Sequence, residues 1–305
     1  MHVTVPRAGR HIRRRTGPAH VRKVGTPLAD TLWYMQAKRP SERRERRTAC
    51  PANRMNQKWE VCTMILGGGT VDITAISRTA FGTTVHVPYV SLAATDGTHK
   101  VVIDTGAREV DVVKKPHAHR WPEEEMENVL RACMGWSLED VDTVINTHLH
   151  YDHCGGNFFF PNASFYVQRR EWEAAWNHSP YEAAYYDCGD FCKTRIPYSR
   201  WHFVDGEEEI FPGLRVMLAP GHTHGSQIVL LDTREGDLCF PGDTFTCAFN
   251  LEHNIQPFIV VDDRRLFQSM DLVRQVAQRI VFSHDDQIKT GMRSGFYEVP
   301  DPWYT

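Results

Sequence analysis

The sequence predicts a layered α/β sandwich, because strand-like segments come first and helices then alternate with strands. Three observations carry this prediction. Two extended apolar segments, 85–93 and 100–103, precede any helical pattern. An amphipathic helix is marked from Pro122 onwards. Between residues 141 and 284, short apolar segments typical of strands alternate with helical periodicity.

The first strands begin near Trp59. Three glycines at 67–69 separate two strand-like segments, which predicts a hairpin. No GK[ST] motif follows these glycines, so a phosphate-binding loop is not indicated. The later strand 100–103 runs into Asp104-Thr105-Gly106.

The first helix is expected between Pro122 and Gly135. Acidic residues at 123–125 suit its positive end, and the glycine predicts where it stops. Its apolar residues fall on one face: Met126, Val129, Leu130, Cys133 and Met134. A short buried strand at 141–147 is then expected to end at His148.

The rest of the chain alternates strands and helices. The expected elements are a strand at 164–167, a helix at 169–176, an irregular segment at 177–200, strands at 214–218, 228–231 and 238–240, a helix at 263–278 and a strand at 279–282. The irregular segment holds Tyr181, Tyr185, Tyr186, Phe191 and Tyr198. These aromatic residues either line a pocket or form a small core that holds the loop down.

Charge is distributed unevenly along the chain. Residues 1–55 carry 14 Lys and Arg against 3 Asp and Glu, a net charge of +11, whereas residues 56–305 sum to −14. The basic segment shows no hydrophobic periodicity, so we expect a disordered N-terminal extension or translated sequence upstream of a start at Met55. An organelle presequence or a nucleic-acid contact is less well supported. Residues 56–305 are expected to form one folded domain.

The eight cysteines are scattered and no CxxC pair repeats, so free thiols are expected rather than a disulfide framework. No apolar segment is long enough to cross a bilayer, and the first thirty residues lack the apolar core of a secretory signal. These features predict a cytoplasmic location.

The segment 147–153 (THLHYDH) places three histidines and one aspartate within six residues, directly after a strand. Neutral imidazole and carboxylate are preferred ligands of zinc and related metals. His148 and His150 can point the same way from an extended backbone. Asp152 and His153 emerge where the chain turns, so they can face a second ion. The spacing therefore divides the four side chains between two neighbouring sites.

Three later segments each place one more ligand-type side chain after a strand: His222, Asp243 and His284. Open α/β sheets build their sites at the carboxyl ends of strands, so all these side chains are expected to converge. His224, in the same turn as His222, is interpreted as a loop residue and not as a ligand.

The series HxHxDH, GH, GD and a terminal histidine resembles the ligand series of the metallo-β-lactamase superfamily, over residues 59–297. Within it, the chain is most similar to the N-acyl-homoserine lactonase and 4-pyridoxolactonase branch. The segments that carry this closer similarity are 148–157 (HLHYDHCGGN), Phe160-Pro161 and 283–285 (SHD). The resemblance implies an αββα sandwich as catalytic domain, with two zinc ions and a quorum-quenching role.

The resemblance also implies how the ligands divide. The first ion would be held by His148, His150 and His222. The second would be held by Asp152, His153 and His284, and Asp243 would bridge the two. Asp104 would support the site from behind.

The activity implied is the opening of a lactone ring by a hydroxide that bridges the two metals. Asp152 would protonate the leaving alkoxide. In these lactonases a tyrosine three residues after the bridging aspartate commonly contacts the substrate carbonyl, and here that position is Thr246. Its hydroxyl is shorter, so another donor serves or the substrate differs.

Two alternatives remain open. One is a thioesterase or phosphoester hydrolase of the same fold, similar to glyoxalase II, although glyoxalase II would be expected to add a helical substrate domain. The other is a non-hydrolytic metal-binding relative. The expected partner is a small-molecule lactone, and a homodimer is a further hypothesis. No membrane or nucleic-acid partner is expected, because residues 56–305 are acidic.

Overall fold

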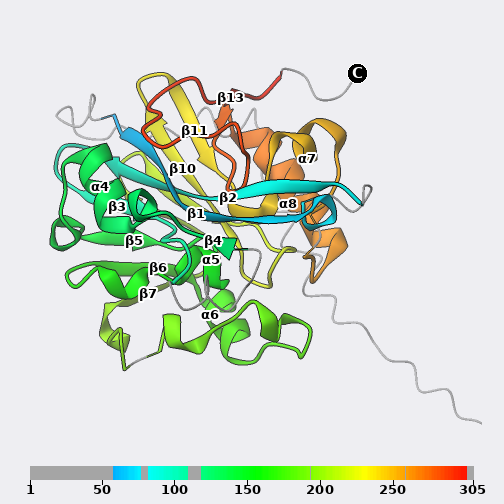
Figure 1. Ribbon diagram of the computed structural model, residues 1–305, viewed down its shortest axis with the longest axis horizontal. Helices are drawn as coiled ribbons and strands as arrows, with labels where there is room; N and C mark the ends of the chain where they lie inside the picture. Colours follow the sequence, from blue (N-terminus) through cyan, green and yellow to red (C-terminus); the bar gives the residue numbers. More distant parts are fainter. Residues whose placement is uncertain (1–57, 77–81, 109–117, 193, 258, 301–305) are drawn as a thin grey trace, which may run out of the picture. The chain divides into compact units, whose positions relative to one another are not determined.

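Two β-sheets lie face to face, and helices cover the outer face of each sheet (Figure 1). The computed structural model describes residues 58–76, 82–108, 118–192, 194–257 and 259–300. The arrangement is the αββα sandwich that the sequence predicts. The predicted basic extension lies outside the described residues.

The first sheet has seven strands, and their order across the sheet brings segments from the first two thirds of the chain together. In spatial order they are β4 (Ala118–His119), β1 (Glu60–Asp72), β2 (Thr84–Thr95), β3 (Lys100–Ile103), β5 (Thr143–Ile145), β6 (Ser164–Gln168) and β7 (Trp201–Val204). The last four run parallel to one another. Their carboxyl ends therefore meet at one edge of the sheet.

The second sheet has six strands from the C-terminal part of the chain. In spatial order they are β13 (Tyr297–Glu298), β12 (Arg279–Ile280), β11 (Gly236–Phe240), β10 (Gln227–Thr233), β9 (Leu214–Leu218) and β8 (Glu207–Phe211). All pairs are antiparallel except β11 with β12. The sequence pattern predicted neither β4 and β7 of the first sheet nor β8 and β13 of this one.

Buried hydrophobic side chains form three large clusters, one between the two sheets and one between each sheet and its helices. The strand β10 contributes to two of them. Val229 and Leu231 pack between the two sheets, whereas Ile228 and Leu230 face the helices beyond the second sheet. Successive side chains of a strand point to opposite faces, so a strand buried on both faces reads as a continuous apolar segment. A third cluster fills the space between the first sheet and its own helices.

In the described part of the chain, five α-helices flank the sheets or connect their strands: α4 (Met126–Met134), α5 (Tyr151–Cys154), α6 (Arg169–Trp176), α7 (Ala248–His253) and α8 (Asp263–Val276). The helix α4 buries four of the residues predicted for its inner face and ends at Gly135, whose φ of 70° is left-handed. The bounds of α6 agree with the prediction. No helix in the described residues is long and apolar enough to span a membrane.

The predicted hairpin at the three glycines is wrong. Residues 67–69 lie inside the long strand β1, at a register shift against β2 between Ile65 and Gly68. Gly67 has a φ of 103°, and a Cβ built on it would lie 2.8 Å from the backbone oxygen of His119. The glycines therefore permit a bulge and the close approach of β4, and do not reverse the chain.

Candidate metal centre

Ligand-type side chains from both sheets converge at one edge of the sandwich. His148 and His150 lie in the loop after β5, and the short helix α5 carries Asp152 and His153. The remaining three residues follow strands of the second sheet, as His222 after β9, Asp243 in a 3₁₀ turn after β11 and His284 after β12. The convergence expected from the sequence is present in the structure. Six of the seven are buried, and Asp152 is half-buried.

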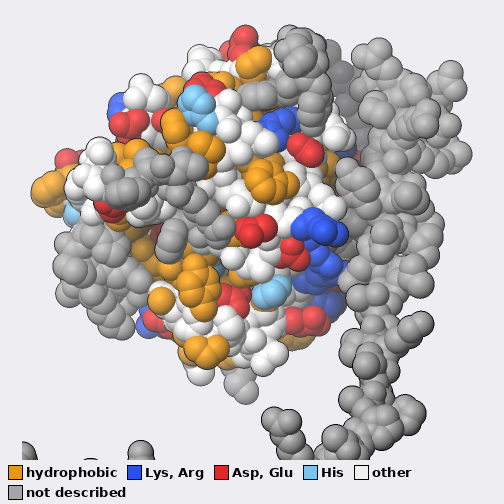
Figure 2. All heavy atoms as spheres, turned by 90° about the vertical axis from the view of Figure 1, so that its right-hand side faces the viewer, with side chains coloured by type: hydrophobic (Ala, Val, Ile, Leu, Met, Phe, Trp, Pro, Cys, Tyr) orange, Lys and Arg blue, Asp and Glu red, His pale blue; other side chains and the backbone are white. Residues whose placement is uncertain are grey.

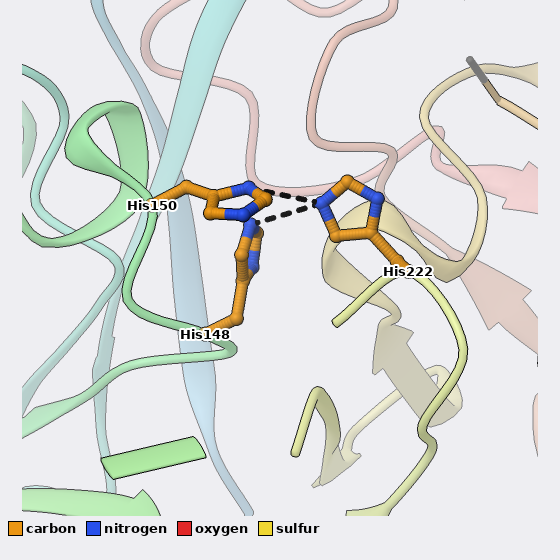
Figure 3. Close-up of side chains that lie close together, drawn as sticks. All are labelled: His148, His150 and His222. Carbon is orange, nitrogen blue, oxygen red and sulfur yellow. Dashed lines mark hydrogen bonds between the residues drawn. The ribbon is translucent and has the colours of Figure 1, made fainter. Parts of the chain in front are cut away.

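Three imidazoles form one cluster (Figure 3). His222 Nε2 lies 3.2 Å from His148 Nε2 and 3.2 Å from His150 Nδ1. The other nitrogen of the ring, His222 Nδ1, lies 2.8 Å from the backbone oxygen of Ile259. That oxygen can only accept, so Nδ1 carries the proton and the Nε2 lone pair faces the other two rings.

A second cluster is formed by Asp152, His153 and His284. His284 Nδ1 lies 2.8 Å from the backbone oxygen of Pro88, so its Nε2 is turned toward the cluster. His153 Nδ1 lies 2.7 Å from Asp104 Oδ2, and among the described residues its buried Nε2 has no hydrogen-bond partner. A buried polar atom without a partner is costly unless a ligand satisfies it.

Asp243 lies between the two clusters. Its Oδ2 is 3.4 Å from His222 Nε2, whereas its Oδ1 is 3.2 Å from His284 Nε2 and 3.4 Å from His153 Nε2. Burial opposes ionisation, but His284 and then His153 outweigh it and hold the pKa of Asp243 well below its usual range. One carboxylate oxygen therefore faces each group of imidazoles.

Asp104 supports both clusters from behind, as the resemblance implies. It accepts hydrogen bonds from Thr147 N and Thr147 Oγ1, both at 2.7 Å, and from His153 Nδ1. Thr147 Oγ1 in turn lies 3.1 Å from His148 Nδ1. Asp104 has a φ of 57°, a left-handed conformation that is uncommon for residues other than glycine and that clusters at functional sites.

Glu171, at the start of α6, was missed by the sequence analysis. It is fully buried and accepts four hydrogen bonds, from Leu149 N, Tyr186 Oη, Thr223 Oγ1 and Gly225 N. Burial raises the pKa of this carboxyl, and the four donors offset part of the shift. A sequence signal existed, because Glu171 is four residues before the buried Ala175 and therefore shares the inner face of the helix.

Thr246 is buried close to the site, but its hydroxyl is already used. Thr246 Oγ1 donates to Asn250 Oδ1 at 2.6 Å, within the loop that leads into α7. The geometry gives this hydroxyl a part in holding the loop. The position at which the related lactonases commonly carry a tyrosine therefore offers no phenol in this chain.

The aromatic segment 177–200 combines the two interpretations left open by its sequence. Tyr186 and Phe191 belong to the core between the first sheet and its helices. The ring of Tyr185 is half-buried, and its centroid lies 5.3 Å from the centroid of the His150 ring. Tyr181 is 53% exposed and packs on Tyr185. Part of the segment is therefore core, and part lies beside the candidate metal centre.

The donor set fits a pair of borderline divalent metal ions. Burial, followed by the neighbouring imidazoles, lowers the pKa of His148 and of His150 well below the usual value, so both rings are neutral ligands. The buried Nε2 of His153, which has no hydrogen-bond partner among the described residues, is a further nitrogen that a metal ion would satisfy. Imidazole nitrogens and carboxylate oxygens, with no thiolate among the grouped residues, suit zinc.

The family model described as the metallo-beta-lactamase superfamily matches residues 83–255. The match covers more than half of the chain, and the fold and the clustered ligands agree with it. The chain belongs to the metallo-β-lactamase superfamily.

Within that superfamily, the chain is similar to N-acyl homoserine lactonases, as the sequence resemblance predicted. It is 30% identical to one from a Bacillus species over 176 residues, which are 56% of this chain and 66% of that protein. It is 30% identical to the N-acyl homoserine lactonase AttM of Azorhizobium caulinodans over 223 residues, 65% of this chain and 82% of that protein. The chain spans just under two thirds of the Bacillus relatives it matches.

Solved structures show the same fold. A quorum-quenching N-acyl homoserine lactone lactonase has a TM-score of 0.67 at 24% identity, over 79% of this chain and 98% of that one. AidC, a dizinc quorum-quenching lactonase, has a TM-score of 0.57 at 16% identity, over 82% of this chain and 100% of that one. At these identities the similarity supports the fold alone.

Proposed function

We propose that this chain is a metal-dependent hydrolase that opens the ring of an N-acyl-homoserine lactone or a related lactone, with two zinc ions per chain. The observation that carries the proposal is the position of Asp243. Its two oxygens face two separate clusters of imidazoles, an arrangement suited to two adjacent cations. The lactonase names of the relatives supply the substrate class.

In this proposal the two ions divide the ligands as the sequence resemblance implies. His148, His150 and His222 would hold one ion. Asp152, His153 and His284 would hold the other, and Asp243 would be shared between them. When bound, such a pair of ions supplies a water-derived nucleophile at neutral pH and a Lewis acid for the carbonyl group.

The protein's own groups then have separate tasks. Asp104 and the backbone oxygens of Ile259 and Pro88 fix the imidazoles in the tautomer whose lone pair points inward. Asp152 is the one of the seven ligand-type residues that is only half-buried, so we assign it the proton transfer: it would take up the proton that the attacking water loses and pass it to the departing ring oxygen.

A panel of lactones tests this proposal. Acyl-homoserine, aromatic and simple γ- and δ-lactones would be assayed with metal-replete enzyme and after chelation, and metals would be counted by elemental analysis. We expect about two metals per chain, lactone hydrolysis, and loss of activity with the metals. One ion or none in a metal-replete preparation would rule out the dinuclear centre.

A thioesterase or phosphoester hydrolase of the same fold is the second candidate, and Thr246 is the observation that favours keeping it. With its hydroxyl bonded to Asn250, the position expected to contact a lactone carbonyl offers no phenol. Thioesters and phosphodiesters therefore belong in the same panel, where turnover of either above every lactone would select this candidate. No turnover with metals bound would favour a non-hydrolytic metal-binding protein.

Other expectations stay predictions. Figure 2 shows acidic and basic side chains lying next to one another on the face it displays, with hydrophobic side chains between them. A protein that tracks a nucleic-acid backbone needs a continuous basic surface, and on the described part of this face the basic side chains have acidic neighbours. Zinc as the native metal rests on the donor set and on the relative described as a dizinc lactonase, whereas the cytoplasmic location and the homodimer stay expectations from the sequence.

A further inference from the structure

One buried carboxylate joins the two loops that carry the three-histidine cluster. Glu171 Oε1 accepts from Leu149 N at 3.0 Å, and Leu149 lies between His148 and His150. Glu171 Oε2 accepts from Thr223 Oγ1 at 2.6 Å and from Gly225 N at 3.1 Å, in the loop that begins with His222. The loops belong to different sheets, so Glu171 is a direct link between them.

The helix and the second loop are also in close contact at this point. A Cβ built on Gly225 would lie 2.1 Å from Glu171 N, a distance that no side chain tolerates. The loop can approach the start of α6 so closely only because residue 225 is glycine. The contact fixes the distance between the backbone of Glu171 and the turn after His222.

The charge of Glu171 is satisfied by neutral donors. Its partners are two backbone N–H groups, the Thr223 hydroxyl and the Tyr186 hydroxyl at 3.0 Å, and none of the four is a cation. A buried negative charge of this kind is stabilised when a cation binds nearby, because the low dielectric strengthens their attraction. Glu171 therefore adds both geometry and charge at the three-histidine cluster.

We propose that Glu171 is a positioning residue that sets the metal affinity of the three-histidine site and leaves that of the second cluster unchanged. The inference rests on the metal part of the proposed function. Of the two clusters, only the first has both of its loops held by Glu171. The four hydrogen bonds require acceptors on both oxygens, and glutamine would turn an NH₂ group toward two of the donors. Glu171→Gln should thus loosen the loops and remove the charge together.

Metal titration of apo-protein tests the inference without relying on activity. Wild type, Glu171→Gln and Glu173→Gln would be titrated with Zn²⁺ by calorimetry and with Co²⁺ by absorption spectroscopy. Glu173 is exposed on the same helix and is the matched control. Losing a partner that orients ligands typically weakens metal binding by about 10–100-fold. We expect a loss of this size in one of two binding steps for Glu171→Gln, and none for Glu173→Gln.

Two single-site backgrounds assign the affected step. His284→Ala disables the second cluster and keeps the three-histidine site, and His150→Ala does the reverse. Adding Glu171→Gln should weaken Co²⁺ binding and change the Co²⁺ spectrum in the His284→Ala background only. Equal weakening in both backgrounds would show a general structural effect and overturn the inference.

The remaining outcomes are also decisive. If wild type binds no ion, the proposed function fails and the inference fails with it. If wild type binds two ions and folded Glu171→Gln binds both with unchanged affinity, only the inference fails. If circular dichroism shows that Glu171→Gln does not fold, Thr223→Val takes its place, because it keeps the charge and removes one of the links to the second loop. Unchanged affinity in folded Thr223→Val would then overturn the inference.

Discussion

Four histidines at the centre are oriented by a contact on the ring nitrogen that faces away from the cluster. Those contacts are made to Thr147 Oγ1, Asp104 Oδ2, the backbone oxygen of Ile259 and the backbone oxygen of Pro88. Each contact fixes a ring plane and a tautomer before any ligand arrives. Metal-binding histidines depend on such partners for affinity as well as for geometry.

Asp243→Asn should lower the metal content below two per chain and reduce kcat at least as much as the ~10²–10³-fold typical of losing one essential transition-state contact. The amide carries no charge and cannot bridge two cations as a carboxylate does. Elemental analysis and kinetics on the best lactone would measure both effects. Asp205→Asn changes an exposed aspartate paired with Arg169 and should alter neither. Wild-type metal content in folded Asp243→Asn would contradict the bridging role.

Thr246→Ala should have a much smaller effect on kcat than Asp243→Asn, because the Thr246 hydroxyl is engaged with Asn250. We expect a loss of less than roughly tenfold, well below the ~10²–10³-fold measured where an oxyanion donor is removed. Steady-state kinetics and metal analysis on the same preparation check this. A hundredfold loss with both metals retained would show that Thr246 contacts the substrate after all.

The residues proposed to bind the metal ions were easier to predict from the sequence than the residues that position them. The seven ligand candidates are of distinctive types and follow strands, so their convergence could be inferred. Glu171 positions other residues through a hydrogen bond with Thr223, far away in the sequence. Asn250 likewise donates to the distant backbone oxygen of Ile76 and also holds the turn that leads into α7. Most glutamates are exposed to solvent, so the residue type alone predicts no role for Glu171. Only its position on the inner face of α6 distinguishes Glu171 from the exposed glutamates.

Elements with strong local signals were predicted well, and those set by tertiary contacts were not. The helices α4, α6 and α8 have apolar faces that bury against a sheet, and their predicted bounds are close to the observed ones. Strand β8 begins with three exposed glutamates, a residue type uncommon in strands, so the sequence carried no strand signal there. The glycines inside β1 read as a turn, because a bulge and a turn both favour positive φ.

Leu130→Ala should lower the free energy of unfolding by about 2–5 kcal/mol, the cost of a large-to-small change in a well-packed core. Leu130 is fully buried where α4 meets the first sheet. Glu127→Ala on the exposed face of the same helix removes only an ion pair with Arg131, and should cost under about 1 kcal/mol. Urea unfolding of the two variants measures the difference. Equal stabilities would place α4 outside the cooperative core.

At the scale of the whole molecule, the basic segment 1–55 and the strands of the sandwich occupy different parts of the sequence. Every element of the two sheets lies between residues 60 and 298. The +11 segment precedes all of them. The division at residue 55 stays a prediction from charge and periodicity.

Deleting residues 1–54 should leave folding and kcat/KM nearly unchanged, because this segment lacks the periodicity of a packed element. Deleting residues 1–65 should instead abolish folding, because it removes the buried Trp59 and the first half of β1. Circular dichroism, solubility and kinetics compare the two. An insoluble or inactive protein after the shorter deletion would place the boundary earlier in the chain.

Each of the two clusters draws side chains from both sheets. In the first cluster, His148 and His150 follow a strand of the first sheet and His222 follows a strand of the second. In the second cluster, Asp152 and His153 follow a strand of the first sheet and His284 follows a strand of the second. Bound ions would therefore cross-link the two halves of the sandwich, and loading would be coupled to folding. The ions would slow amide exchange where the sheets meet and raise the midpoint of thermal unfolding with metal concentration. In cells short of metal, the unloaded protein would be the form most open to proteases.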